Sequence, residues 1–231
     1  MQKDKPTDKI CYKKAFTLAE ILITLGIIGI VAAMTLPTLL AKINERQTIS
    51  KLRQSQSILT QAIRLSEEQY GGAVGWTNSE ISGKGATDIA EKLKTSLKIL
   101  EDCGVKDTQM KCFADDYKYK NGKATNIHHS TSGYHYKIKL LNGSGIMWRA
   151  TSEGEKNQDV SIYFFIDTNG PKPPNTLGMD FFLFEYRGDN LLPLGAPDSI
   201  YPYTTNCVPK TSDGWGCAYY VLKFGNMDYL H

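Results

Sequence analysis

The sequence lacks an excess of charge of either sign over most of its length. Of its 231 residues, 27 are Lys or Arg and 24 are Asp or Glu. Five of those lysines and two of those aspartates lie in residues 1–15, which leaves 22 residues of each sign in the rest of the chain. Binding to nucleic acid through phosphate contacts needs clustered positive charge. The neutral remainder excludes a nucleic-acid role that depends on bulk charge, and we expect no nucleic-acid partner.

Signatures of enzyme chemistry are also missing. The chain contains no Gly-x-Ser-x-Gly, no phosphate-binding loop and no His-Glu-x-x-His, and it has no internal repeats. The residues around Cys217 are only faintly similar to those around a thiol-protease cysteine, because the far-downstream histidine of such enzymes is absent and only His231 follows. We therefore expect that the protein is not an enzyme.

A long charge-free run follows the basic N-terminus. No Asp, Glu, Lys or Arg occurs from Ile21 to Ala41. In a helix this run would be about 31 Å long, which matches the hydrocarbon core of a bilayer. The lysines before it place the N-terminus in the cytoplasm. We expect a single-pass protein whose remainder, from Lys42 onward, faces the periplasm or the exterior.

Three interpretations of this run compete: a secretory signal peptide cut near Ala33, an uncleaved anchor, and a segment processed just before Phe16. Glu20 favours the third. A carboxylate in hydrocarbon costs about 2.5–3.5 kcal/mol at the bilayer centre and less near its edge, and a signal peptide or passive anchor gains nothing from it. Cleavage between Ala15 and Phe16 would create an amine four residues before Glu20, at the positive end of the helix, where a carboxylate is partly compensated.

Residues 13–23, Lys-Lys-Ala-Phe-Thr-Leu-Ala-Glu-Ile-Leu-Ile, resemble the prepilin cleavage and methylation motif of type IV pilins and type II secretion pseudopilins. The resemblance implies that prepilin peptidase cuts after Ala15 and methylates the amine of Phe16. It also implies that Glu20 pairs with the N-terminal amine of a neighbouring subunit, and that Pro37 marks where pilin helices bend or melt in the filament. The family usually has Gly before the cut, and Ala15 departs from that pattern.

The resemblance further implies a structural subunit of a type II secretion pseudopilus or a type IV pilus that assembles into a helical filament. Its partners would be prepilin peptidase, other pilin or pseudopilin subunits, an inner-membrane assembly platform and the membrane itself. Its location would be the bacterial inner membrane, with a periplasmic head, and then a pseudopilus or cell-surface pilus. The alternative is a minor pilin whose head serves DNA uptake or adhesion, with a local basic face at Lys118, Lys120 and Lys123.

Residues 42–70 predict an amphipathic continuation of the helix. Apolar residues recur there near a 3.6-residue period, and Gly71-Gly72 ends the pattern. The domain organisation that we expect is a leader over 1–15, a transmembrane and filament-core helix over 16–41, the amphipathic continuation over 42–70, and a globular α+β head over 71–231.

Within the head, the apolar spacing predicts a second helix from Asp88 to Leu100, capped by Asp88 and Glu91. Alternation with period two predicts strands over 134–140 and 146–148, joined by a hairpin at Asn142-Gly143, and further strands over 160–166, 181–186 and 218–224. A long helix followed by antiparallel strands predicts an α+β, pilin-like fold, in which a small antiparallel sheet packs on the helix.

Five cysteines are present, and Cys11 lies in the expected leader. The other four, Cys103, Cys112, Cys207 and Cys217, allow three connectivities. We favour the local pairs 103–112 and 207–217, because each closes a short loop containing Gly or Pro and an exported head meets an oxidising compartment. Free buried thiols are the alternative. A disulfide near the C-terminus recurs in pilin heads, so the resemblance implies the second pair too.

Two groups of polar residues could bind metal ions. Asp167, Asn169, Asn175 and Asp180 offer oxygen ligands of the kind that calcium prefers, although their spacing is not that of an EF-hand. A simple turn is the alternative, because Asn, Gly and three prolines form one without a metal. His128, His129 and His135 are close together in sequence but have no partner at metal-ligand spacing, so we interpret them as part of a solvated loop.

Overall fold

The computed structural model describes residues 16–77, 81–125, 128–152, 160–187 and 189–231. The expected leader, with Ala15 and Cys11, lies outside the described residues. The chain divides into two compact units, Met1–Ile43 and Asn44–His231, which we describe separately. Helix α1 (Leu18–Tyr70) begins in the first unit and continues into the second.

The first unit consists of the apolar part of α1. The helix continues through Pro37 in the single subunit. Among the described residues, α1 is one helix long and apolar enough to cross a membrane. Its apolar side chains are largely uncovered, from Leu18 with 77% of its surface exposed to Leu40 with 55%. Such a surface needs a membrane or other helices to cover it.

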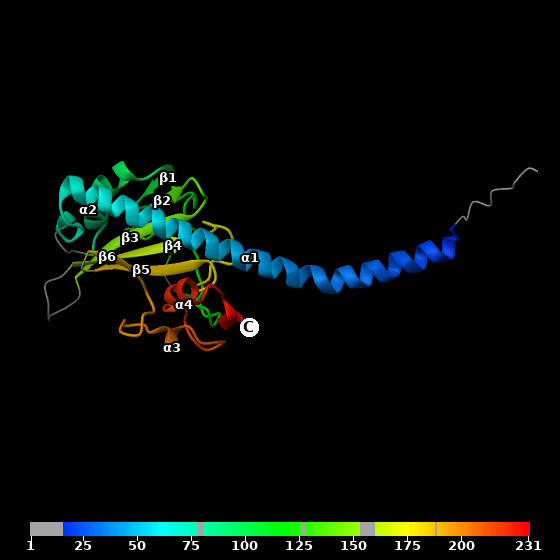
Figure 1. Cartoon of the computed structure of the whole chain (residues 1–231). Coiled ribbons are helices and arrows are strands. Elements are labelled where there is room, and N and C mark those ends of the chain that lie inside the picture. The colour runs from blue at the N-terminus through cyan, green and yellow to red at the C-terminus, as the bar shows by residue number, and fades with distance from the viewer. Residues whose placement is uncertain (1–15, 78–80, 126–127, 153–159, 188) are drawn as a thin grey trace, which may run out of the picture. The chain divides into compact units, whose positions relative to one another are not determined.

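The second unit is built on a six-stranded antiparallel sheet (Figure 1). The strand order follows the chain, so each strand pairs with its neighbour in sequence. The strands are β1 (Ile99–Gly104), β2 (Tyr136–Leu140), β3 (Gly145–Ser152), β4 (Val160–Asp167), β5 (Phe181–Arg187) and β6 (Asn190–Pro193). The hairpin at Asn142-Gly143 is confirmed between β2 and β3, where Gly143 has a φ of 86° that suits glycine.

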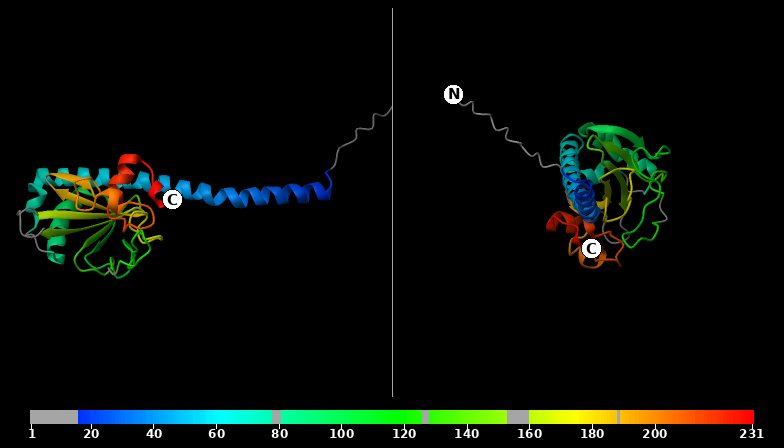
Figure 2. Two further views of the ribbon diagram at one scale, coloured as in Figure 1. Left: turned by 90° about the horizontal axis from the view of Figure 1, so that it is seen from below. Right: turned by 90° about the vertical axis from the view of Figure 1, so that its right-hand side faces the viewer.

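Both faces of the sheet are covered (Figure 2). On one face, residues 44–70 of α1 bury an apolar stripe that includes Leu52, Leu59 and Ile63. On the other, the segment before β2 contributes Phe113 and Tyr117 to a second apolar cluster. Strands between two apolar layers are apolar on both sides, as in the Tyr-Phe-Phe run of β4. The expected α+β fold, a helix packed on an antiparallel sheet, is confirmed.

The predicted helix from Asp88 to Leu100 is wrong at both ends. Helix α2 spans Gly83–Leu93, and the side chain of Ser82 caps it by accepting a hydrogen bond from Gly85 N at 3.1 Å. Asp88 instead pairs with Lys84, one turn earlier. After α2, a short 3₁₀ turn (Lys94–Ser96) leads into β1, whose pairing with β2 outweighs the helical spacing of the leucines.

The strand predicted over 218–224 is also wrong, because these residues belong to helix α4 (Cys217–Phe224). Cys217, Ala218 and Val221 are buried at helical spacing, and Gly225 ends the helix in the left-handed conformation with a φ of 70°. A short helix, α3 (Tyr203–Asn206), precedes α4. Strands β1 and β6 and the 3₁₀ helices Ala73–Trp76 and Asp228–Leu230 were not predicted.

Candidate assembly and ligand sites

The N-terminus of α1 is closed by a reciprocal cap between Thr17 and Glu20. The backbone nitrogen and the hydroxyl of Thr17 each donate to a Glu20 carboxylate oxygen at 2.8 Å. The backbone nitrogen of Glu20 in turn donates to the Thr17 hydroxyl at 3.2 Å. This is the capping box, in which a Ser or Thr and a Glu three residues later satisfy backbone donors that the first helical turn leaves open. The Thr-x-x-Glu spacing over residues 17–20 is a sequence signal for this cap, which we did not predict.

The cap gives the Glu20 carboxylate a local partner in the isolated subunit. Both residues are exposed, and the apolar residues that follow along α1 are exposed too. A carboxylate at this place is held at the positive end of the helix, where its charge is stabilised. It is therefore positioned beside the residue, Phe16, whose amine is expected from the sequence to be freed by cleavage.

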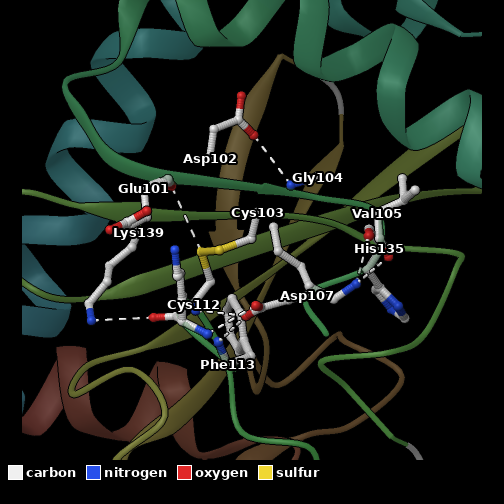
Figure 3. The surroundings of a disulfide bond; sticks show 12 residues. Glu101, Asp102, Cys103, Gly104, Val105, Asp107, Cys112, Phe113, His135 and Lys139 are labelled. Atoms are coloured by element: carbon white, nitrogen blue, oxygen red, sulfur yellow. Dashed lines mark hydrogen bonds between the residues drawn. A yellow bond between two sulfur atoms is a disulfide. The ribbon is translucent and has the colours of Figure 1, made fainter. Parts of the chain in front are cut away.

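The first disulfide, Cys103–Cys112, joins β1 to the segment that follows it (Figure 3). Asp107 lies inside the loop that it closes and is buried. The Asp107 carboxylate accepts hydrogen bonds from the backbone nitrogens of Lys111 at 2.9 Å, Cys112 at 2.7 Å and Phe113 at 3.2 Å. The covalent bond and the carboxylate thus fix the same turn from two sides.

The second disulfide, Cys207–Cys217, connects the end of α3 to the start of α4. Both cysteines are buried in the main apolar cluster. The two local pairs that the sequence favoured are therefore the pairs in the structure, and the four cysteines of the described head are not free thiols.

The loop between β4 and β5 brings the four predicted calcium ligands into one hydrogen-bonded turn. Asp180 accepts from the backbone nitrogens of Asn175 at 2.8 Å and Thr176 at 2.7 Å. Asp167 accepts from the backbone nitrogen of Asn169 at 3.0 Å and from the Tyr117 hydroxyl. These bonds are what a metal-free turn would use to hold its shape.

Two observations in the same loop fit a cation. The side-chain oxygens of Asn169 and Asn175 are buried without a hydrogen-bond partner in the described structure. Burial and the nearby Asp180 charge raise the pKa of Asp167 well above its usual range, and burial raises the pKa of Asp180 to about 6. No Lys or Arg of the described residues forms an ion pair with either carboxylate. Buried carboxylates and open amide oxygens are suitable calcium ligands, and calcium binding stays a prediction.

If the loop binds calcium, chelation will lower the melting temperature of the full chain in detergent. A ligand present at a hundred times its Kd stabilises by about 2.7 kcal/mol, which shifts the melting temperature by about 5–10 °C for a domain of this size. Asp180→Asn should abolish the calcium dependence, and Asp198→Asn, on an exposed segment outside the loop, should keep it. If the parent chain has the same melting temperature with calcium and with chelator, the prediction that this loop binds calcium is wrong.

The interpretation of the three histidines as a solvated loop is wrong for two of them. His129 is 2% exposed and His135 is 6% exposed. The ring of His129 packs against Tyr117 and Phe181, with centroids at 4.7 and 5.1 Å, and both of its nitrogens lack a partner among the described residues. The alternation of residues in the sequence could not reveal that these histidines are buried. It does not show that a second apolar cluster covers the face of the sheet opposite α1. His128 is exposed beside Asp115 and Asp116.

Burial should make the buried histidines a source of acid sensitivity. Burial, helped by the nearby Lys137 charge, lowers the pKa of His129 to about 3, and that of His135 falls to about 2. Below about pH 6.5 these histidines bind protons in the unfolded chain but not in the folded chain. The free energy of unfolding therefore falls as the pH falls, by about 2 kcal/mol per histidine at pH 5. His129→Leu should therefore lose less stability than the parent between pH 7.5 and pH 5.

The measurement is urea unfolding of the full chain in detergent, followed by tryptophan fluorescence. Asp180 acts in the opposite direction, since its raised pKa lets the folded chain keep a proton that the unfolded chain releases between about pH 6 and 4. That contribution is common to both proteins and cancels in their difference. An equal loss of stability in parent and variant would show that His129 is protonated in the folded chain.

The lysines proposed for a DNA-binding face lie on one loop, but they differ in exposure. Lys118 and Lys123 are exposed, whereas Lys120 is half-buried, with its ammonium 6.0 Å from the Tyr229 ring centroid. Burial lowers the pKa of Lys120. The loop thus presents two exposed ammonium groups, a small basic area for phosphate binding.

Comparison with known proteins gives one match, and it lies at the N-terminus. The family model described as the prokaryotic N-terminal methylation motif matches residues 11–36. This motif is the hallmark of type IV pilins and pseudopilins, and its presence confirms the resemblance found in residues 13–23. No curated protein and no solved structure matches the chain significantly. The match includes Ala15, Phe16 and Glu20, and it ends just before Pro37.

Proposed function

We propose that the protein is a prepilin that matures into a structural subunit of a type II secretion pseudopilus or a type IV pilus. The observation that carries this proposal is the methylation motif over residues 11–36, which runs directly into an apolar helix containing Glu20. Proteins with this motif are structural rather than enzymatic. The helix packed on an antiparallel sheet is the layout that such a subunit needs.

The assembly mechanism that we propose begins with the cap at the start of α1. Prepilin peptidase cuts after Ala15 and methylates the amine of Phe16. Within the bilayer, the Glu20 carboxylate is held by Thr17 and the helix end compensates its charge only in part. The amine of a neighbouring subunit supplies the missing positive charge, and only a subunit in the correct register can do so. The same head-to-tail contact, repeated without closure, produces a filament.

In this proposal the subunit stays in the bacterial inner membrane, with its N-terminus cytoplasmic and its head periplasmic, until the assembly platform extracts it. The loop from Asp167 to Asp180 is similar to a segment in heads of pseudopilin-like proteins, which inclines us toward the secretion machinery. The presence of Glu20 argues against the class of pseudopilin that lacks this residue at the filament tip.

The N-terminus of the mature protein tests the proposal. Mass spectrometry of the membrane fraction and of the sheared surface fraction should find chains that begin at N-methylated Phe16. A mature chain that begins near Met34 would instead indicate a signal peptide. A chain that still begins at Met1 would indicate an uncleaved anchor. Either result would leave the Glu20 charge without a function.

A further inference from the structure

Helices α3 and α4 together carry a group of aromatic side chains around one lysine. We define the α4 patch as Tyr203, Tyr219, Tyr220, Lys223 and Phe224. The rings of Tyr203 and Tyr219 stack with centroids 5.6 Å apart, and those of Tyr220 and Phe224 lie 4.7 Å apart. The Lys223 ammonium lies 5.9, 5.2 and 5.4 Å from the ring centroids of Tyr203, Tyr219 and Phe224. The rings therefore hold a cation at the surface.

Tyr203 and Tyr220 pack against the main apolar cluster with part of their surface, and the rest of the patch is at least partly exposed. Helix α4 buries Cys217, Ala218 and Val221, whereas Lys223 is exposed and Phe224 keeps 45% of its surface exposed. Aromatic rings with polar tips, next to a lysine, are typical of proteins at the headgroup layer of a membrane.

The segment that follows α4 is hydrogen-bonded to a residue that lies close to the charge-free run in the sequence. Just after α4, the backbone nitrogen of Met227 donates to a carboxylate oxygen of Glu45 at 2.5 Å. In Figure 1 the C-terminal segment lies at the end of the head that contains the first residues of the second unit. Glu45 is four residues after Ala41, the last residue of the charge-free run. Four residues reach at most about 14 Å, so Glu45, which binds the segment after α4, can lie no further than that from the end of the charge-free run.

The charge of the neighbouring chain indicates which surface the patch meets. Lys42, Arg46, Lys51 and Arg53 follow the apolar run, against the single acidic residue Glu45 over the same residues. Each basic residue near an anionic lipid surface contributes about 1 kcal/mol of attraction. Together with Lys223, these residues complement a layer of anionic phosphate headgroups.

We propose that the α4 patch docks on the headgroup layer of an anionic phospholipid bilayer while the subunit is anchored in the membrane. This inference rests on the anchoring in the proposed function. Docking fixes the orientation of the head before assembly, and extraction into a filament must release it. The patch then becomes available at the moment when the subunit leaves the membrane.

The test measures how close the patch lies to lipid in the full chain. In a Cys11→Ser background, Phe224→Cys is labelled with an environment-sensitive fluorophore and reconstituted into vesicles of phosphatidylethanolamine and phosphatidylglycerol. Tyr70→Cys is the matched control, because Tyr70 is an aromatic residue with 40% exposure, about 38 Å further along α1 than Glu45. Nitroxide-labelled lipid headgroups should quench the label at 224 severalfold more than the label at 70, and aqueous iodide should do the reverse.

Further measurements separate the possible causes. Lys223→Cys should reproduce the quenching at 224, and replacing phosphatidylglycerol by phosphatidylcholine should weaken it. Equal quenching at 223, 224 and 70 would overturn the docking proposal. Protection from both quenchers that disappears when the protein is diluted in lipid would show that a second copy covers the patch, which also overturns it. Failure of the chain to float with the vesicles would reject the anchoring, whereas flotation with equal quenching would reject the docking alone.

Discussion

Glu20→Ala should reduce incorporation into filaments by up to about a hundredfold while leaving membrane insertion intact. The physical reason is register. A charge at the centre of the membrane costs about 2.5–3.5 kcal/mol and less near its edge, and a correctly placed neighbouring amine removes that cost, which corresponds to a factor of at most about one hundred in an equilibrium. Alanine removes both the free-energy cost of the buried charge and the stabilisation by the neighbouring amine, so a misplaced subunit is no longer disfavoured. Insertion needs only the apolar run, which is unchanged.

The structure adds a control that the motif alone does not suggest. Glu20 also caps α1 through Thr17, so loss of the carboxylate could act by fraying the first turn. Thr17→Val removes the hydroxyl that takes part in the cap but keeps the Glu20 charge. We expect near-normal filament yield from Thr17→Val and very low yield from Glu20→Ala, as measured by immunoblot of sheared and membrane fractions. Equal defects in the two variants would assign the effect to capping, and normal yield from Glu20→Ala would reject the assembly role.

Ala15→Leu should block maturation nearly completely. The peptidase that recognises this motif usually meets Gly before the scissile bond, and Ala15 adds one methyl group to that position. A leucine side chain adds three more carbons at a site that accepts only small residues, so cleavage fails and the chain keeps its basic leader. The measurement is the mobility of the protein on a gel, where the precursor band should remain unshifted, together with the absence of methylated Phe16 in the mass spectrum.

The matched variant for this experiment is Ala15→Gly, which restores the usual residue of the family. It should be processed at least as fast as the parent in a pulse–chase experiment. Slow processing of the parent and fast processing of Ala15→Gly would show that the methyl group limits the reaction. A normally processed Ala15→Leu would show that cleavage takes place elsewhere, and the proposed mature N-terminus would be wrong.

The long helix and the central hairpin could be predicted because local patterns specify them. The apolar stripe of α1 repeats over many turns, and Asn142-Gly143 is a strong turn signal. The errors fall where a tertiary contact decides. The leucines up to Leu100 have helical spacing, but the backbone after Ser96 pairs with β2. Residues 218–224 alternate too weakly to separate a strand from a short buried helix.

The candidate sites show the same division. Local cysteine pairs could be inferred because a loop of about ten residues brings the sulfurs together without information about the rest of the fold. The burial of His129 and Lys137 could not be inferred, because the groups around them come from segments far away in sequence or irregular in structure, such as Tyr117 and Phe181 around His129. The Lys137 ammonium donates to three backbone carbonyls, of Val105, Ser132 and His135, at 2.7–3.0 Å. Its charge is satisfied by irregular backbone that no periodicity predicts.

If the head is exported, as the proposed function requires, the agreement between strand order and chain order has a consequence for its folding. A sheet in which β1 to β6 pair consecutively needs no crossover connection. Residues 105–135 separate β1 from β2, but from β2 onward each strand pairs with the next one along the chain, so less loop entropy is lost before those contacts form. The amphipathic residues of α1 would emerge from the membrane before the strands. Their apolar stripe would be exposed until the sheet covers it. Each hairpin could then join that stripe as it emerges, so that translocation from N- to C-terminus and folding proceed in the same order. The Cys207–Cys217 bond would form last, after the strands have paired.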